Sequence, residues 1–110
     1  MEIHSTVLGG GVVVLKLEGK LNMVSAPRLR EEILSAVAAG NSRVSVDLAE
    51  VNFIDSSGLG ALINGLKSTR QAGGDLRIAA PTEQVRLVLE LTNIDKVLTA
   101  HDSAETAFSG

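Results

Sequence analysis

Cysteine is absent from this 110-residue chain, and its only aromatic side chains are two phenylalanines, with no tryptophan and no tyrosine. Without cysteine, the chain has no disulfides, no thiolate catalysis and no cysteine-ligated metal. Without aromatic faces, it lacks the surfaces on which single-stranded nucleic acids usually stack. The core must therefore be aliphatic. With 45% hydrophobic residues, a chain of this length can bury such a core without covalent cross-links.

Charge of one sign is not concentrated in any segment. Ten basic and thirteen acidic residues are mixed along the chain, for a formal net charge of −3. Because no basic cluster could follow a phosphate backbone, we expect no nucleic-acid partner. Apolar runs stay short of the roughly 18 residues that span a membrane, and the first ten residues lack a basic stretch followed by a long apolar one. We expect a cytoplasmic protein without membrane association.

Alternating strand-like and helical patterns predict an α/β fold. Two strand-like segments, 2–8 and 12–19, flank three consecutive glycines that permit a tight reversal, which predicts a hairpin. The later predicted elements are a helix at 26–39 capped by Ser25, a strand at 43–49, a helix ending near Ala72, a strand at 75–80, a helix from Pro81-Thr82 to Thr92-Asn93, a strand at 96–100 and a short helix over 104–108. This β-β-α-β-α-β-α-β-α order predicts a single domain with a mixed, mostly parallel sheet, an N-terminal hairpin and helices packed against the sheet.

The junction between the third strand and the second helix reads NFIDSSGLGAL, with Asp55, Ser56 and Ser57 at the helix start. Any of the three can cap a helix, and one good cap stabilises by about 1 kcal/mol. Capping needs one such residue rather than three. It also leaves unexplained Gly58 and Gly60, each of which lowers helix propensity by about 1 kcal/mol relative to alanine. Glycines at this cost suggest that another surface approaches the backbone closely, so the residues alone favour a docking site with exposed hydroxyls.

Enzymatic interpretations of the junction fail on spacing. A nucleophile elbow needs G-x-S-x-G, but neither serine has a glycine two residues before it, and His4 and His101 each stand alone near a terminus. A phosphate-binding loop needs G-x-x-x-x-G-K-[ST]. Gly60 and Gly65 have the spacing of the two glycines, but Leu66 separates Gly65 from Lys67, so the lysine comes one residue too late. Asp47 lies within a predicted strand, without the acidic pair of a two-component receiver. We therefore expect no catalytic, cofactor-binding or metal-binding residue.

Four segments, FIDSSGLGALINGLK, GKLNMVSAPRLREEI, QAGGDLRIAAP and LTNIDKVLTAHDSAETA, occur at spacings that cover nearly the whole chain. Together they resemble the STAS domains, in particular the bacterial anti-sigma factor antagonists. The first resembles the family signature, the second its second strand and first helix, the third a later strand entry and the fourth the terminal segment. The resemblance implies one STAS domain over residues 1–110, and we expect it to be monomeric when free.

The resemblance implies a partner-switching mechanism. In such a system the unphosphorylated antagonist binds a GHKL-type anti-sigma factor that is also a serine kinase. The kinase phosphorylates the serine after the motif's aspartate, which is Ser56 here, and a PP2C-type phosphatase restores the free serine. The chain would then be a phosphoprotein that regulates transcription or another signalling output, and not an enzyme. The expected partner-binding residues are Asn22, Ile54, Asp55, Ser56, Ser57, Gly58 and Leu59.

The physical consequences of a phosphate at Ser56 fit this mechanism. It would add about −1.5 to −2 charges at a helix N-terminus, where free N–H groups and the dipole favour anions, so the fold should tolerate it. A dianion cannot be desolvated cheaply against an apolar partner, so only binding should be lost. We expect Leu59 and Ile54 to supply the apolar contacts around the hydroxyl.

The chain departs from the family pattern near this site. Lys20 and Asn22 stand where the family usually has acids, and Asn93 replaces a frequent glycine. Two alternatives stay open. The domain could be a constitutive interaction subunit of another complex, in lipid transport or secretion regulation, with Ser56 serving only as a helix cap. It could also sense a small ligand or nucleotide, although no phosphate loop or aromatic pocket favours this.

Overall fold

The computed structural model describes residues 1–109; Gly110, the last residue of the predicted domain, lies outside them. Its helices and strands follow the predicted order as far as the third helix. They are β1 (Glu2–Gly9), β2 (Val12–Leu21), α1 (Ala26–Ala38), β3 (Arg43–Ile54), α2 (Ser56–Gln71), β4 (Asp75–Ala79), α3 (Glu83–Leu91), the 3-10 helix η1 (Ile94–Lys96) and β5 (Ala100–His101).

The five strands form one sheet in sequence order, β1-β2-β3-β4-β5. β1 and β2 pair antiparallel, and all later neighbours pair parallel. Gly9 at the end of β1 and the connecting residues Gly10 and Gly11 have positive φ angles of 93°, 63° and 81°, a conformation that the missing Cβ makes accessible. The predicted hairpin and the mixed, mostly parallel sheet are confirmed.

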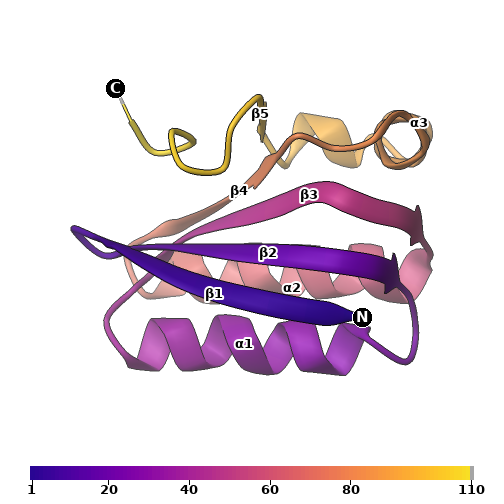
Figure 1. Ribbon diagram of the computed structural model, residues 1–110. Coiled ribbons are helices and arrows are strands. Elements are labelled where there is room, and N and C mark those ends of the chain that lie inside the picture. The colour runs from indigo at the N-terminus through magenta and orange to yellow at the C-terminus, as the bar shows by residue number, and fades with distance from the viewer. Residues whose placement is uncertain (110) are drawn as a thin grey trace.

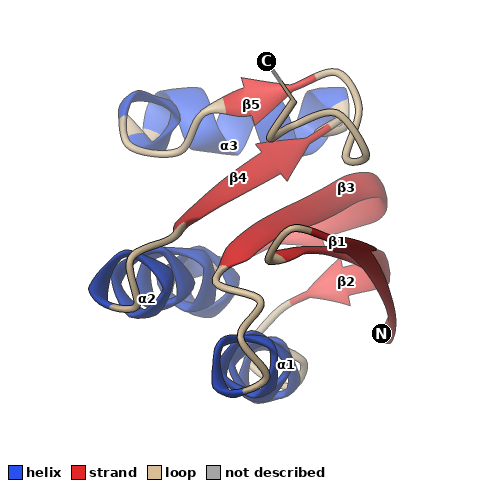
Figure 2. Cartoon of the chain, turned by 90° about the vertical axis from the view of Figure 1, so that its left-hand side faces the viewer, coloured by secondary structure: helices blue, strands red, loops and turns tan. Residues whose placement is uncertain are grey.

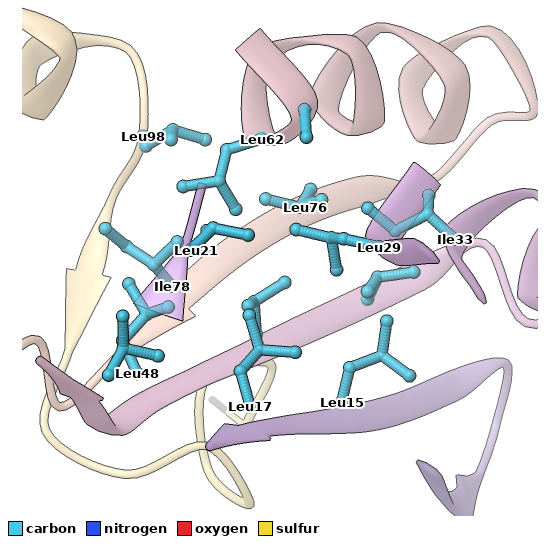
Figure 3. Packing of buried hydrophobic residues seen from close by; sticks show 14 of the residues in the cluster. Leu15, Leu17, Leu21, Leu29, Ile33, Leu48, Leu62, Leu76, Ile78 and Leu98 are labelled. Atoms are coloured by element: carbon cyan, nitrogen blue, oxygen red, sulfur yellow. The ribbon is translucent and has the colours of Figure 1, made fainter. Parts of the chain in front are cut away.

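Helices α1 and α2 lie side by side against one face of the sheet (Figures 1 and 2). Leu15 and Leu17 of β2 pack there with Leu29 and Ile33 of α1 and with Leu62 of α2, all essentially without solvent exposure (Figure 3). Burying each such side chain contributes roughly 1.5–3 kcal/mol relative to leaving it exposed. The core is aliphatic, as the composition predicts. The longest helix, α2, has 16 residues, and no helix within residues 1–109 has the length and hydropathy needed to cross a membrane.

The chain after β5 covers part of the opposite face of the sheet (Figure 2). The buried Ser45 of β3 donates a hydrogen bond from Oγ to the carbonyl oxygen of Ala104 at 2.8 Å. Arg77 of β4 donates to the carbonyl oxygen of Ala107 at 2.7 Å, and its guanidinium carbon lies 4.4 Å from the centroid of the Phe108 ring. Side chains of the sheet thus hold this segment in place.

Three predicted boundaries are corrected. Residues 104–108 form turns rather than a helix, because carbonyl oxygens in this segment accept hydrogen bonds from the sheet. The last strand was predicted at 96–100, but β5 comprises Ala100–His101 and shares only residue 100 with that range, because a left-handed Asn93 (φ 59°) leads from α3 into η1. β3 runs beyond its predicted end at residue 49, since its last residues pair with β2 alone after β4 has ended.

Candidate functional site

The carboxyl ends of β2 and β3 meet at one end of the sheet, where Leu21 and Ile54 are register partners. Each of these strands leads into a helix, so the N-termini of α1 and α2 lie at this end too (Figure 1, right-hand side). The predicted site residues therefore come from two separate segments, the loop after β2 and the start of α2. In open parallel sheets, ligands commonly bind outside the carboxyl ends of the strands.

Asp55 holds the two segments together. It occupies the N-cap position of α2 with an extended backbone, and its Oδ1 accepts a hydrogen bond from the N–H of Gly58 at 2.9 Å. Its Oδ2 accepts from the N–H of Met23, in the loop after β2, at 3.1 Å. Its own N–H donates to the carbonyl oxygen of Leu21 at 3.2 Å. Of the three residues that could cap α2, Asp55 therefore does so.

The two serines take the first positions of the helix. Ser56 is N1 and exposed, and Ser57 is N2 and half-buried. Within residues 1–109 neither hydroxyl forms a hydrogen bond with protein, because the capping bond is made by the preceding aspartate. Ser56 is thus exposed to solvent at the positive end of the α2 dipole.

Asn22 organises the loop between β2 and α1. Its Oδ1 accepts from the N–H groups of Val24 and Ser25 at 3.0 and 3.2 Å, the pattern of an Asx turn. Its own N–H donates to Ser25 Oγ at 2.9 Å, and that hydroxyl donates in turn to the carbonyl oxygen of Lys20 at 2.7 Å. Ser25 is at the predicted N-cap of α1, but its side chain ties the loop together and makes no capping bond. Because an amide oxygen serves as the acceptor here, Asn22 needs no charge for this role.

Three large apolar side chains around these residues are exposed, and we call them the apolar rim: Met23, Val24 and Phe53, which expose 72%, 80% and 46% of their surface. An open groove of about 300 Å³ runs among them. It is lined by the rim together with Lys20, Asn22 and Asp55. The rim was not predicted from the sequence, although two apolar residues in a short loop between a strand end and a helix start are a usable signal.

Three of the predicted partner-binding residues lie in the interior. Ile54 and Leu59 are only 6% and 7% exposed and belong to the core, so the prediction that they supply exposed apolar contacts is wrong. A Cβ on Gly58, which is also buried, would lie 2.4 Å from the carbonyl oxygen of Leu21. This glycine therefore lets α2 approach the end of β2, and the surface that comes close to it is internal. At Gly60, the nearest atom to such a Cβ is the Arg30 Nη2 at 3.6 Å, an ordinary contact distance.

One group of metal-ligating side chains occurs within residues 1–109, on the hairpin of β1 and β2. The ligand atoms of Glu2, His4 and Glu18 all lie within 4.8 Å of one another. His4 Nε2 is 3.6 Å from a Glu2 oxygen and 3.8 Å from a Glu18 oxygen, and the side chains of all three are substantially exposed. Exposed groups of this kind are common without a metal, and we assign no metal role to them.

Comparison with known proteins gives the family. The sequence model of the STAS domain matches residues 5–107. A Thermotoga maritima protein assigned as an anti-sigma factor antagonist is 32% identical over 97 residues, which cover 87% of this chain and 86% of the relative. A crystal structure of an antagonist assigned in the same way, also from Thermotoga maritima, superposes with a TM-score of 0.86 at 29% identity, covering 96% of this chain and 91% of the other. The Bacillus cell fate determinant SpoIIAA, in its phosphorylated form, has the same fold, with a TM-score of 0.74 at 19% identity over 96% of both chains.

The chain therefore belongs to the STAS domain family. The resemblance to anti-sigma factor antagonists that its sequence suggests is confirmed by these relatives.

Proposed function

We propose that this chain is an anti-sigma factor antagonist that changes partner when Ser56 is phosphorylated. The observation that carries the proposal is the placement of the Ser56 hydroxyl, which is exposed at the first position of α2 while Asp55 performs the capping. The relatives named anti-sigma factor antagonists support it, as does the existence of a phosphorylated form of SpoIIAA. The chain acts in this proposal as a cytoplasmic regulator without catalytic activity.

In the unphosphorylated state the apolar rim docks on a GHKL-type anti-sigma factor that is also a serine kinase. Met23, Val24 and Phe53 are exposed in the free domain, and large exposed apolar groups gathered in one place typify protein interaction surfaces. Docking them would remove apolar area from water at about 25 cal/mol per Å². The groove among them gives a partner side chain a place to insert beside Asp55, the residue before Ser56.

Phosphorylation of Ser56 then weakens binding, and the partner dissociates. The kinase transfers the γ-phosphoryl group of ATP to Ser56 Oγ, the hydroxyl proton passes to a base of the kinase, and ADP leaves. The ester places about −1.5 to −2 charges next to the Asp55 carboxylate, and the apolar partner surface cannot desolvate them cheaply. A PP2C-type phosphatase hydrolyses the ester with water and returns the free serine.

The proposal is tested by incubating the chain with its cognate kinase and ATP and mapping the phosphate by mass spectrometry. We expect one phosphate, on Ser56, with no labelling of a Ser56→Ala variant and normal labelling of Ser57→Ala. Phosphate on another residue alone, or none with a kinase proven to bind the chain, would contradict the proposal.

The alternative of a constitutive interaction subunit, in which Ser56 only caps α2, is less well supported. Asp55 already accepts the hydrogen bond that a capping serine would take. Sensing of a small ligand is also less well supported, since the groove is open to solvent and its lining includes the exposed apolar rim. Calorimetry with ATP and GTP, showing no heat of binding, would exclude that alternative.

A further inference from the structure

A second groove runs between α1 and α2, with a cationic side chain at its N-terminal end. It encloses about 200 Å³ and is lined by Arg30, Ile33, Leu34, Asn64, Gly65 and Ser68. Arg30 is exposed, and its Nη2 lies 3.6 Å from the position that a Cβ on Gly60 would occupy. Among the residues that the structure describes, no carboxylate forms an ion pair with this guanidinium.

Helical geometry brings Ser56 within reach of Arg30. Ser56 precedes Gly60 by four residues of α2, so the two positions share a face of the helix, with Cβ positions about 5–6 Å apart. Since residue 60 is glycine, no side chain of its own separates the guanidinium from the first turn. A phosphate on Ser56 Oγ would extend from that turn, and an arginine side chain has the length and freedom to meet it.

Because of the charge already present at the start of α2, a phosphate on Ser56 would require a nearby cation to stabilise it. The carboxylate of Asp55 already uses the N–H of Gly58, one of the helix donors that would otherwise stabilise an anion. Asp55 also places a like charge beside any phosphate on Ser56. The helix terminus alone is therefore a poor receptor for a dianion here, whereas a guanidinium can donate two parallel hydrogen bonds to phosphate oxygens.

We propose that Arg30 is the phosphate receptor of this domain. When Ser56 is phosphorylated, the guanidinium moves toward the first turn of α2 and binds two phosphate oxygens, which stabilises the phosphorylated state and shields the ester from hydrolysis. The inference deepens the proposed function and rests on it for the biological source of the phosphate. Lys20, which lines the other groove beside Asp55, is the competing cation, but an ammonium is a strongly hydrated point charge without the guanidinium fork.

The test uses the full chain with phosphoserine encoded genetically at position 56, so that no kinase is needed. Phosphorus NMR follows the titration of the phosphate, since a bound cation lowers the pKa of its second ionisation. We expect the wild-type phosphate to titrate at a pH about 0.5 lower than in Arg30→Gln, with Arg30→Lys in between. Arg86→Gln, which removes an exposed arginine from α3, is the matched control and should leave the titration unchanged.

A second readout is the rate at which a non-cognate phosphatase removes the phosphate. It should rise several-fold in Arg30→Gln and stay at the wild-type value in Arg86→Gln. The inference is overturned if Arg30→Gln titrates and is dephosphorylated like the wild type, or if Lys20→Gln produces the effects instead. Because the phosphoserine is encoded, the result can be read even if a cognate kinase labels another residue, which would overturn the proposed function alone. The unphosphorylated Arg30→Gln variant should unfold at the wild-type temperature, since the side chain is exposed.

Discussion

The carboxylate of Asp55 binds the N–H of Met23 at 3.1 Å, although the two residues are 32 positions apart in the sequence. The same carboxylate caps α2 through Gly58. The loop that carries most of the apolar rim is therefore tied to the turn that carries Ser56. Under the proposed function, a partner that contacts the rim would meet Ser56 in a fixed relation to it, so that one phosphate would control the whole surface.

Replacing Asp55 by asparagine tests this tie. The amide has one acceptor oxygen where the carboxylate has two, so either Gly58 or Met23 loses its acceptor. We expect the free energy of unfolding, measured by urea denaturation, to fall by about 1–2 kcal/mol. Asp102→Asn makes the same chemical change at an exposed site and should leave stability unchanged. If Asp55→Asn were as stable as the wild type, the carboxylate would not hold the two segments together.

Two glycines of the same helix should respond in opposite ways to alanine. At Gly58 the new Cβ would lie 2.4 Å from the Leu21 carbonyl oxygen and 2.8 Å from Leu21 Cγ, so the helix must move away from β2. We expect Gly58→Ala to destabilise by about 3 kcal/mol. At Gly60 the nearest atom is 3.6 Å away at the end of a flexible side chain, and Gly60→Ala should stabilise by about 0.5 kcal/mol through helix propensity.

Thermal and urea unfolding of the two variants side by side measure this difference. Equal effects at the two positions would contradict the packing of α2 against the end of β2. Such a result would also restore the interpretation, made from the sequence, that both glycines serve an external docking surface.

The spacing of apolar residues from Leu59 onward shows which features of the structure the sequence could predict. It begins the series Leu59, Leu62, Ile63 and Leu66, whose helical spacing correctly predicts α2. The same spacing puts Leu59 on the inner face of the helix, and it is buried there. The prediction that Leu59 contacts a partner therefore conflicted with the periodicity that located the helix. The order of elements, the hairpin and the exposed serine depend on local patterns of this kind, and local patterns were sufficient for them.

Phe53 shows what local patterns could not supply. In a regular strand its neighbours Asn52 and Ile54 would share one face, but the register between β2 and β3 shifts between Gly19 and Lys20. Ile54 is consequently buried while Asn52 and Phe53 are both exposed. The irregularity arises from pairing with a strand far away in the sequence, so alternation along β3 alone could not place Phe53 in the rim.

The rim predicts a specific loss of binding. Val24 is 80% exposed, and changing it to serine should weaken the affinity for the anti-sigma factor by about tenfold or more, because burying a valine side chain fully is worth about 1.5 kcal/mol or more and about 1.4 kcal/mol corresponds to tenfold. Leu91→Ser is the matched control, since Leu91 is 74% exposed on α3. It should bind like the wild type in calorimetry. Both variants should unfold at the wild-type temperature, and a larger loss of binding in Leu91→Ser would move the interface to α3.

Substitutions of Ser56 should change partner binding without changing the stability of the fold. A carboxylate at the first position of α2 interacts favourably with the helix dipole, by about 0.3–1 kcal/mol, and the neighbouring Asp55 offsets part of this. We therefore expect Ser56→Asp to keep wild-type stability but to bind the anti-sigma factor at least about 100-fold more weakly, because the partner must desolvate the charge. Ser56→Ala should bind with wild-type affinity and remain bound when ATP is added.

Ser35→Asp adds the same charge at an exposed position of α1 and serves as the control for net charge. Undiminished binding by Ser56→Asp, together with undiminished binding by the phosphorylated chain, would leave Ser56 without a role in partner choice.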